Sequence, residues 1–477
     1  KSKDFLLKKI NTISLKSGKI NYHIIKNNIL YIESFRNYIV IHTSISDYTL
    51  RYTLKKIHKK LGNEFVQCHK SYLINISNIF NIKDRRYFMN TKQYDLIVLG
   101  FGKAGKTLAA KFGSMGKSVA MIEENPLMYG GTCINIACIP TKTMIIAASK
   151  GLSYEQVLNQ REVVTSRLRN KNFGMLDTNE HVDVYTGHGE FISNKEIAVT
   201  AGEDKIVLCG ETIIINTGAV AIKPNIDGID TATGFYNSTE IQQLSSQPST
   251  LGVIGAGPIG LEFASLYAKL GTKVTVFNIE ANILKREEPI VQELANEYLA
   301  EQGITILNSV TLNSVSNDGN KPVITANNEN YTFDAVLYAT GRRPNTANIG
   351  LENTDITTNE RGAIVVNDTC ESSVPGVYAV GDVNGGPQFT YISLDDFRIV
   401  FGALTGNGHY TLKDRKNIPY TTFLTPPLAR VGLTEEDAIN KGYTVKTKEM
   451  LVATMPRAHV NDNIQGAVKS VVDAESN

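Results

Sequence analysis

Two glycine-rich segments constrain the fold of this chain more than any other feature of its sequence. In the first, the pattern G-x-G-x-x-G follows a short apolar run and opens a stretch with helical spacing, and a second apolar run then ends on Glu123. Its glycines are Gly100, Gly102 and Gly105. Such a strand–turn–helix–strand unit lets the backbone approach a pyrophosphate at the helix N-terminus, and the acid can bind ribose hydroxyls. The segment therefore predicts a dinucleotide-binding fold.

The same pattern recurs later in the chain, with a neutral residue where the first copy has an acid. Its glycines are Gly255, Gly257 and Gly260. Asn278 follows Gly255 at the spacing that separates Glu123 from Gly100. The first copy suits a ribose without a phosphate, as in FAD, whereas the second leaves NADH and NADPH open. Lys285 and Arg286, further on, are either phosphate contacts or solvated surface charges. Two dinucleotide sites in one chain suggest a flavin and a nicotinamide.

Three further segments fit this architecture. Residues 213–219 and 338–345 are strand-to-turn segments that we expect to close the respective folds, and residues 377–382 form a strand that ends on Gly381 and Asp382. A carboxylate at that point can bond a ribityl hydroxyl. The fold class predicted is α/β, with two Rossmann-like dinucleotide-binding domains.

The segment 130–142 carries the most specific chemistry of the sequence, because it places Cys133 and Cys138 directly after the first dinucleotide unit. A helical segment with a distorted first turn can bring two such thiols within bonding reach, and a helix N-terminus lowers thiol pKa values. The alternatives are a metal site or two unrelated cysteines. A metal site needs further ligands at nearby spacing, and none are present, so no metal is predicted. The five cysteines of the chain do not suggest a secreted disulfide framework.

From Tyr94 onward, these motifs resemble the class I pyridine nucleotide–disulfide oxidoreductases, which include lipoamide dehydrogenase, glutathione reductase and mercuric reductase. The chain most resembles the reactive-chlorine-resistance subgroup, to which bacterial hypothiocyanous acid reductases belong. The stretches that carry this second resemblance are 97–106, 385–398 and 424–436.

The resemblance implies that hydride passes from NAD(P)H to FAD, then to a Cys133–Cys138 disulfide, and on to an electrophilic oxidant such as hypothiocyanous acid. Cys138 would be the charge-transfer thiolate beside the flavin, and Cys133 the interchange thiol. Lys142 and Glu262 match the family's ion pair near the flavin, or else are two helix-surface charges. The expected cofactor contacts are Gly100, Gly102, Gly105, Glu123, Gly131, Thr132, Lys142, Thr217, Gly218, Gly255, Gly257, Gly260, Asn278, Gly341, Gly381 and Asp382.

Residues 418–477 resemble the beginning of the family's dimerisation domain, with strand character at 466–473. The resemblance implies a homodimer whose interface is truncated here. The family's His-Pro acid–base motif does not occur, and none of the eight histidines has its context. We therefore expect impaired disulfide turnover from the chain as written, unless the substrate is electrophilic enough to need little acid help.

The net charge of +2 conceals two oppositely charged segments. Residues 1–92 hold 18 of the 49 Lys and Arg residues and only five of the 47 acids, which gives this segment +13 and the remainder −11. Such asymmetry suggests a polyanionic partner for the basic segment. The segment resembles the LytTR-type DNA-binding domain of bacterial response regulators, a mostly-β fold, although its last strand is not evident. The stretches that carry the resemblance are 29–33, 37–42, 68–75 and 78–82.

By position in that resemblance, Arg36, Asn37 and Lys70 are the candidate DNA contacts. Arg36 would read guanine or a phosphate, and Lys70 would meet a phosphate. The alternative for each is an ordinary solvated side chain. A charge of +13 predicts steep salt dependence of DNA binding.

Four domains follow from these assignments, and two accounts of their joining stay open. The predicted domains are 1–91 (DNA binding), 92–238 with 346–417 (FAD), 239–345 (NAD(P)) and 418–477 (dimerisation). The chain is either an oxidant-responsive fusion or an accidental joining of two genes near Met89. The alternative function is a DNA-binding transcription regulator with an inactive or sensory flavoprotein half. With no visible signal peptide and no apolar run near 18 residues, we expect a cytoplasmic protein without membrane contact.

Overall fold

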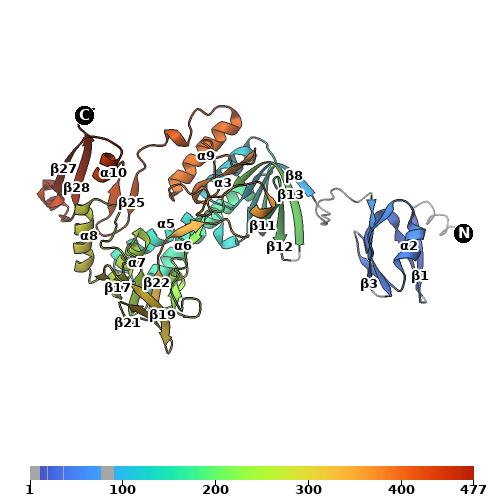
Figure 1. Ribbon diagram of the computed structural model, residues 1–477, viewed down its shortest axis with the longest axis horizontal. Coiled ribbons are helices and arrows are strands. Elements are labelled where there is room, and N and C mark those ends of the chain that lie inside the picture. The colour runs from blue at the N-terminus through green and yellow to red at the C-terminus, as the bar shows by residue number, and fades with distance from the viewer. Residues whose placement is uncertain are drawn as a thin grey trace. The chain divides into compact units, whose positions relative to one another are not determined.

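The computed structural model describes residues 11–18, 20–35, 37–43, 45–76, 91–202 and 204–476 (Figure 1). The chain divides into two compact units, residues 1–92 and 93–477.

The N-terminal unit, blue in Figure 1, is a five-stranded antiparallel sheet in the order β5-β4-β3-β7-β6, with a separate hairpin of β1 and β2. Its helix, α2, buries Leu54, Ile57 and Leu61 and exposes lysines, as the spacing of the apolar residues predicts. The mostly-β prediction is confirmed. The elements are β1 Thr12–Ser17, β2 Ile20–Ile25, β3 Ile29–Phe35, β4 Tyr38–Thr43, β5 Asp47–Leu50, α2 Leu54–Leu61, β6 Phe65–His69 and β7 Tyr72–Asn75.

The first glycine motif lies in a seven-stranded sheet ordered β10-β9-β8-β13-β12-β11, with β24 paired to β13. Strands β8, β9 and β10 are parallel, whereas β11, β12 and β13 are antiparallel. Along β8, Val98 packs toward helix α3 and Ile97 packs into the core on the other face, because successive side chains alternate. The elements are β8 Thr91–Leu99, α3 Lys103–Ser114, β9 Val119–Glu123, α4 Thr132–Asn135, α5 Cys138–Ser149, α6 Tyr154–Asp177, β10 Val182–Thr186, β11 His188–Ser193, β12 Glu196–Ala201, β13 Asp204–Ile215, β24 Val377–Ala379 and α9 Thr390–Thr405.

The second glycine motif lies in a five-stranded parallel sheet ordered β15-β22-β16-β17-β18, beside the antiparallel strands β19, β20 and β21. Helix α7 begins at Pro258, directly after the motif, where proline's missing N–H costs nothing. Met144 of α5 belongs to the same buried core as Leu261 of α7, so the cysteine-bearing helix packs against this fold. The elements are β15 Phe235–Tyr236, β16 Thr250–Ile254, α7 Pro258–Lys269, β17 Lys273–Phe277, α8 Pro289–Glu301, β18 Thr305–Leu307, β19 Leu312–Asp318, β20 Lys321–Ala326, β21 Glu329–Thr332 and β22 Ala335–Tyr338.

Two short pairs of strands complete the C-terminal part, and a third pair links the two dinucleotide folds. Strands β27 and β28 are antiparallel, and β28 matches the strand expected at 466–473. The elements are β14 Ala219–Ala221, β23 Arg342–Pro344, β25 Tyr420–Thr422, β26 Leu428–Arg430, α10 Glu435–Asn440, β27 Val445–Leu451, α11 Pro456–Val460 and β28 Ala467–Asp473. The 3₁₀ helices are Lys26–Asn28, Pro126–Met128, Ile241–Gln243, Leu351–Asn353, Gly381–Asn384, Leu412–Asp414 and Val452–Thr454.

Within the described residues, the stretch Thr132–Ser149 is long and apolar enough to cross a membrane by length and composition. The expectation that no apolar run approaches 18 residues was therefore too strict. The stretch spans both α4 and α5, and its Lys142 makes an ion pair. A core helix of a soluble protein passes the same test, so the stretch is weak evidence for a membrane span.

Candidate active site

The two candidate redox cysteines lie on consecutive helices that are separated by a break in the backbone. Cys133 is in the single turn α4, and Cys138 is the first residue of α5. Between them Ala137 has φ −128° and ψ −100°, outside the helical region, so the segment is not one regular helix. Both thiols are free and partly buried, and they are hydrogen-bonded to each other.

The surroundings treat the two thiols differently. The hydrogen bond from Cys133 lowers the pKa of Cys138, and the hydroxyl of Thr390 and the charge of Lys142 lower it further, although burial opposes them. The Cys138 Sγ lies 3.8 Å from the Thr390 Oγ1, at the N-terminus of α9. The same bond keeps the proton on Cys133, whose pKa it raises together with burial. The arrangement favours Cys138 as the thiolate of the reduced pair.

Lys142 and Glu262 form an ion pair, with 2.7 Å between Lys142 Nζ and Glu262 Oε2. The pair joins α5 to α7, and the Glu262 side chain is only 9% exposed, so these residues are not two helix-surface charges. Phe423 contacts both partners. Its backbone N–H donates to Glu262 Oε1 at 2.8 Å, and its ring lies 4.5 Å from the ammonium of Lys142. A residue after β25 therefore orients the pair.

The first glycine turn is packed around the side chain of Asn216. A Cβ on Gly100 would lie 2.5 Å from the Asn216 backbone oxygen, and one on Gly102 would lie 2.5 Å from its Oδ1. The Gly105 N–H donates to Asn216 Oδ1 at 2.8 Å, while Asn216 Nδ2 donates to the carbonyl of Val380 at 2.8 Å. Asn216 thus fixes the turn to the strand that precedes Gly381. A side chain at Gly100 would therefore meet backbone, and one at Gly102 would displace the Asn216 side chain.

Two partly buried carboxylates flank this turn. Glu123 accepts hydrogen bonds from the backbone N–H groups of Phe101, at 3.0 Å, and Asn125, at 3.1 Å. Burial raises the pKa of Glu123, and burial likewise raises that of Asp382, with Arg342 opposing it. Glycine backbone that can approach a pyrophosphate, with a carboxylate available to hydroxyls, fits the donor set that a dinucleotide such as FAD requires.

The segments around Gly218 and Gly341 are joined to each other. Strand β14 pairs with β23, the Thr217 hydroxyl donates to the Asn345 carbonyl at 2.6 Å, and the Asn345 N–H donates to the Gly218 carbonyl at 2.9 Å. We expected each segment to close its own fold, whereas the structure shows that together they link the two folds. A Cβ on Gly218 would lie 3.9 Å from the Thr132 hydroxyl, so Thr132 faces this link.

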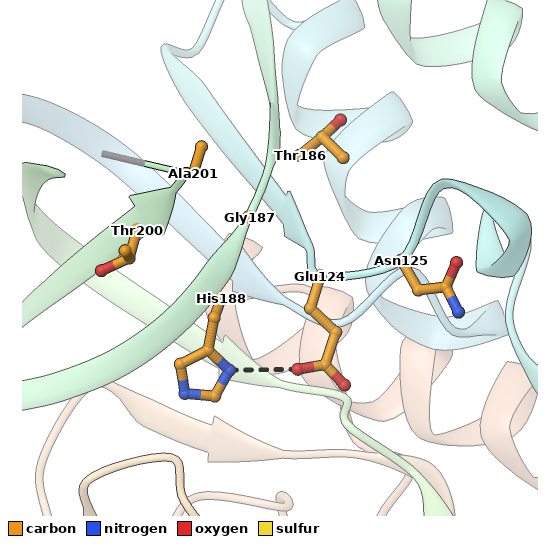
Figure 2. Close-up of a pocket in the computed structure, with 8 residues that line it drawn as sticks. Glu124, Asn125, Thr186, Gly187, His188, Thr200 and Ala201 are labelled. Carbon is orange, nitrogen blue, oxygen red and sulfur yellow. Dashed lines mark hydrogen bonds and ion pairs between the residues drawn. The ribbon is translucent and has the colours of Figure 1, made fainter. Parts of the chain in front are cut away.

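A pocket of about 600 Å³ opens where β9 and β10 end, beside Glu123 (Figure 2). In Figure 2, the side chains of Glu124 and His188 meet across it, with 3.0 Å between Glu124 Oε2 and His188 Nδ1. The other His188 nitrogen, Nε2, lies 2.8 Å from the carbonyl of Asn348. Because the carboxyl ends of parallel strands are where such folds bind ligands, the pocket extends the first dinucleotide cradle.

The second glycine turn is tight at its first and third glycines and open at its second. A Cβ on Gly255 would lie 2.7 Å from the Ala339 carbonyl oxygen, and one on Gly260 would lie 2.0 Å from that of Gly255. Among the described residues, none has an atom within 4 Å of the position that a Cβ on Gly257 would take, so there is room for a ligand beside this glycine. This turn also fits a bound dinucleotide.

Asn278, which replaces the acid of the first copy, is buried and bonded to protein. Its Nδ2 donates to the Glu280 carbonyl at 3.0 Å and to Asn308 Oδ1 at 2.8 Å, and its Oδ1 accepts from the Glu280 N–H. Lys285 is ion-paired with the carboxylate of Glu280. A role for Asn278 toward a ribose stays a prediction.

In the N-terminal unit, Asn37 is exposed between β3 and β4, and Lys70 is exposed between β6 and β7. Both turns lie at ends of sheet strands, where a side chain can reach a polyanion. Arg36 lies outside the described residues.

Three residues of this site were missed by sequence reasoning, namely Thr390, Asn216 and Phe423. Each lies far along the chain from the group that it contacts, so spacing within a motif could not reveal it. Asn216 is adjacent to the predicted Thr217, and that position was the available signal. Among the described residues, no group of three or more His, Cys, Asp or Glu side chains is arranged to hold a metal ion.

Known families match three parts of the chain, two of which overlap at residues 94–99. The pyridine nucleotide-disulphide oxidoreductase family matches residues 94–396, and the dimerisation domain of such enzymes matches residues 418–477. The LytTr DNA-binding domain matches residues 19–99.

Individual relatives agree with these matches. The chain is 42% identical over 381 residues to the probable pyridine nucleotide-disulfide oxidoreductase RclA of Escherichia coli (strain K12), which covers 80% of this chain and 86% of the relative. It is 33% identical over 410 residues to mercuric reductase of Staphylococcus aureus, which covers 82% and 74%. A solved structure titled as the Cu(II) complex of the HOCl-induced flavoprotein disulfide reductase RclA from Escherichia coli superposes with a TM-score of 0.78 at 42% identity, covering 81% of this chain and 87% of that chain. This chain therefore belongs to the pyridine nucleotide-disulphide oxidoreductase family, is RclA-like within it, and carries an N-terminal LytTR DNA-binding domain.

Proposed function

We propose that residues from Tyr94 onward form an NAD(P)H-dependent disulfide reductase whose working group is the Cys133–Cys138 pair. The observation that carries the proposal is the asymmetry of the pair, in which Cys138 is favoured as thiolate by Cys133, Thr390 and Lys142. FAD, when bound in the first glycine cradle, supplies hydride acceptance from the nicotinamide and reduction of the cysteine disulfide.

Each residue near the pair has a defined task in this proposal. Glu262 and Phe423 hold the Lys142 ammonium in place, and that ammonium is available to an anionic partner beside Cys138. Gly131 and Thr132 begin the turn that presents Cys133, and the remaining expected contacts bind the two dinucleotides. Cys133, as the interchange thiol, attacks the oxidised substrate.

Hypothiocyanous acid is the substrate that we propose. Cys133 loses its proton to solvent and attacks the sulfur as the thiolate, a sulfenyl thiocyanate forms on Cys133, and the departing hydroxide takes up a proton from solvent to become water. The Cys138 thiolate then attacks the Cys133 sulfur, forms the disulfide and releases thiocyanate. Thiolate attack on such an electrophile needs little acid assistance.

A screen of NADH and NADPH oxidation against hypothiocyanous acid, glutathione disulfide, lipoamide and Cu(II) tests the proposal. Hypothiocyanous acid is expected to give the highest rate, and Cys133→Ser and Cys138→Ser are expected to abolish it. Cys209→Ser is the matched control, because Cys209 is a free, partly buried thiol on β13. A rate that survives Cys133→Ser would contradict the proposal, and the same screen decides between NADH and NADPH.

For disulfide substrates, we propose slow turnover by the polypeptide of residues 1–477 itself. The comparison is with the same polypeptide extended by a family-type ending that supplies the His-Pro acid–base motif. Equal rates of glutathione disulfide reduction by the two would contradict the expectation.

We further propose that residues 1–91 bind duplex DNA through Arg36, Asn37 and Lys70. Binding should weaken steeply as salt rises, because the contacts release counterions from phosphates. Lys70→Ala should weaken binding to all sequences alike, whereas Lys16→Ala, an exposed charge on β1, is the control. Salt-sensitive DNA binding by a chain that shows no NAD(P)H turnover would favour the alternative function, a regulator with a sensory flavoprotein half.

The organisation proposed for the chain has four domains, a homodimer formed through residues 418–477, and a cytoplasmic location. The apolar side chains Met450, Leu451, Val468 and Val472 are exposed on β27 and β28 and are available to such an interface. The domain bounds are 1–91, 92–238 with 346–417, 239–345 and 418–477. A single full-length species in the mass spectrum of the native product would support a genuine fusion, and two separate species would support the gene-junction account.

A further inference from the structure

A buried lysine next to the cysteine pair has no part in the mechanism described so far. Lys106 lies one turn into α3, and only 5% of its surface is exposed. Its ammonium donates a hydrogen bond to the side-chain oxygen of Asn172 on α6. In the described part of the chain it makes no ion pair with a carboxylate. Burying an ammonium without a counter-charge is unfavourable, so its place needs an explanation.

The packing puts this lysine beside the turn that carries Cys133. A Cβ on Gly131 would lie 2.8 Å from the Cα of Gly102, directly before α3. A Cβ on Gly130 would lie 3.3 Å from the Cβ of Asn172. Residues 130 and 131 are therefore held between the start of α3 and the side chain that binds the Lys106 ammonium.

The charges of the two groups act on each other. Cys138 and burial raise the pKa of Cys133, whereas the Thr390 hydroxyl and then the charge of Lys106 lower it. In return, a Cys133 thiolate raises the pKa of Lys106. Burial and the neighbouring charge of Lys103 together hold the pKa of Lys106 at about 8, so the ammonium form still predominates at neutral pH.

We propose that Lys106 is a positioning residue for the reductase reaction, whose positive charge at neutral pH stabilises the Cys133 thiolate in the moment before this thiolate attacks the oxidised substrate. The inference rests on the proposed function of Cys133. Lys106 would thus supply the positive charge for the interchange thiol Cys133, as Lys142 supplies one for Cys138.

The other charged groups around the turn define what Lys106 alone contributes. Cys138 raises the pKa of Cys133, and the charge of Lys103 lowers the pKa of Lys106. Arg169 of α6 donates a hydrogen bond of 2.9 Å to Asn135, the last residue of α4. These groups are unchanged when Lys106 is replaced, so a change in the ionisation of Cys133 reports on Lys106.

The test measures the rate of alkylation of Cys133 by iodoacetamide against pH, in the full-length flavin-loaded chain. Cys138→Ser is introduced first, so that Cys133 is the only cysteine between Lys117 and Lys142, the ends of its tryptic peptide. Lys106→Gln can still donate to Asn172 but has no charge, and it should raise the midpoint of the pH profile by about one unit. Lys106→Arg should restore the midpoint. Lys111→Met, on the exposed side of the same helix, should leave it unchanged.

Equal midpoints for Lys106→Gln and its parent would overturn the proposal. If Lys106→Gln fails to fold, Asn172→Asp decides, because the new carboxylate would neutralise Lys106 and should raise the midpoint in the same way. An unchanged midpoint there overturns the proposal too. The assay uses neither nicotinamide nor an oxidised substrate, so its failure is distinguishable from failure of the reductase function.

Discussion

The two glycine turns have the same spacing and different constraints. In the first, Gly102 is closed by the side chain of Asn216, whereas its counterpart Gly257 faces open space. In the first, the acid Glu123 accepts hydrogen bonds from two backbone N–H groups, whereas its counterpart Asn278 donates to Glu280 and Asn308. One motif therefore serves two purposes, because the surrounding residues decide whether a glycine is needed for packing or for a ligand.

We expect the largest loss of stability from a substitution at Gly260, the third glycine of the second turn. Gly260→Ala places a Cβ 2.0 Å from the Gly255 carbonyl oxygen, a backbone atom that cannot move aside cheaply. It should lower the free energy of unfolding by about 3 kcal/mol. Thermal unfolding followed by circular dichroism measures the loss. Gly257→Ala is the matched control and should cost less than about 1 kcal/mol.

The next largest effect is on cofactor binding, where substitutions in the two turns should affect different dinucleotides. Gly102→Ala displaces Asn216 from the first turn and should weaken FAD binding by about tenfold or more, which corresponds to about 1.4 kcal/mol. The ratio of flavin to protein absorbance after dialysis measures it. Gly257→Ala should keep the flavin and raise the KM for the nicotinamide. Loss of flavin from both variants would remove the distinction between the turns.

Glu123 at the end of β9 and Asn278 directly after β17 hold equivalent positions in the two folds, and changing the charge of either should destabilise its fold. Asn278→Asp would set a carboxylate against two acceptor oxygens, and Glu123→Gln would set an amide group against an N–H donor. Each should cost about 1 to 3 kcal/mol of unfolding free energy. Chemical denaturation of the flavin-free protein measures both. Unchanged stability in Asn278→Asp would show that the second turn tolerates an acid after all.

The raised pKa of Glu123 predicts that the stability of the flavin-free protein depends on pH. Burial raises the pKa of Glu123 above its ordinary value of 4.5, so between 4.5 and the raised value the native state binds this proton more tightly than the unfolded chain. Stability of the flavin-free protein should therefore fall as pH rises through that window. In Glu123→Gln this contribution is absent. Parallel stability profiles for the two proteins would contradict the assignment.

The smallest effect is expected at Lys285, whose ammonium is exposed and paired with Glu280. Such surface pairs contribute at most about 1 kcal/mol, so Lys285→Ala should change the NADPH-to-NADH preference by less than about threefold. Steady-state kinetics with both nucleotides measures this. A larger loss with NADPH alone would identify Lys285 as a phosphate contact and would sharpen the difference between the turns.

Much of the fold could be predicted from local patterns. Both glycine turns lie between a strand and a helix as expected, and the spacing of Leu54, Ile57 and Leu61 matches the single buried face of helix α2. These features depend on residues a few positions apart. The pairing of β14 with β23 was not predicted, because it joins residues more than a hundred positions apart.

The candidate site divides in the same way. Cys133, Cys138, Lys142 and Glu262 could be named because motifs carry them, and the structure places Lys142 and Glu262 in one ion pair. Thr390, Phe423 and Lys106 could not be named, because nothing in their own neighbourhood indicates which group they contact.

The sequence by itself determined that this chain has two dinucleotide folds, a cysteine pair and a basic N-terminal segment. Glycine spacing, thiol spacing and charge are local properties that the chain carries wherever it folds. Only the tertiary structure decided which thiol of the pair is favoured as the thiolate, and which lysine is placed near each thiol. Those choices depend on burial, on the charges of Lys106 from α3 and Lys142 from α5, and on the Thr390 hydroxyl from α9, since the ionisation of a buried group is set by its surroundings in space.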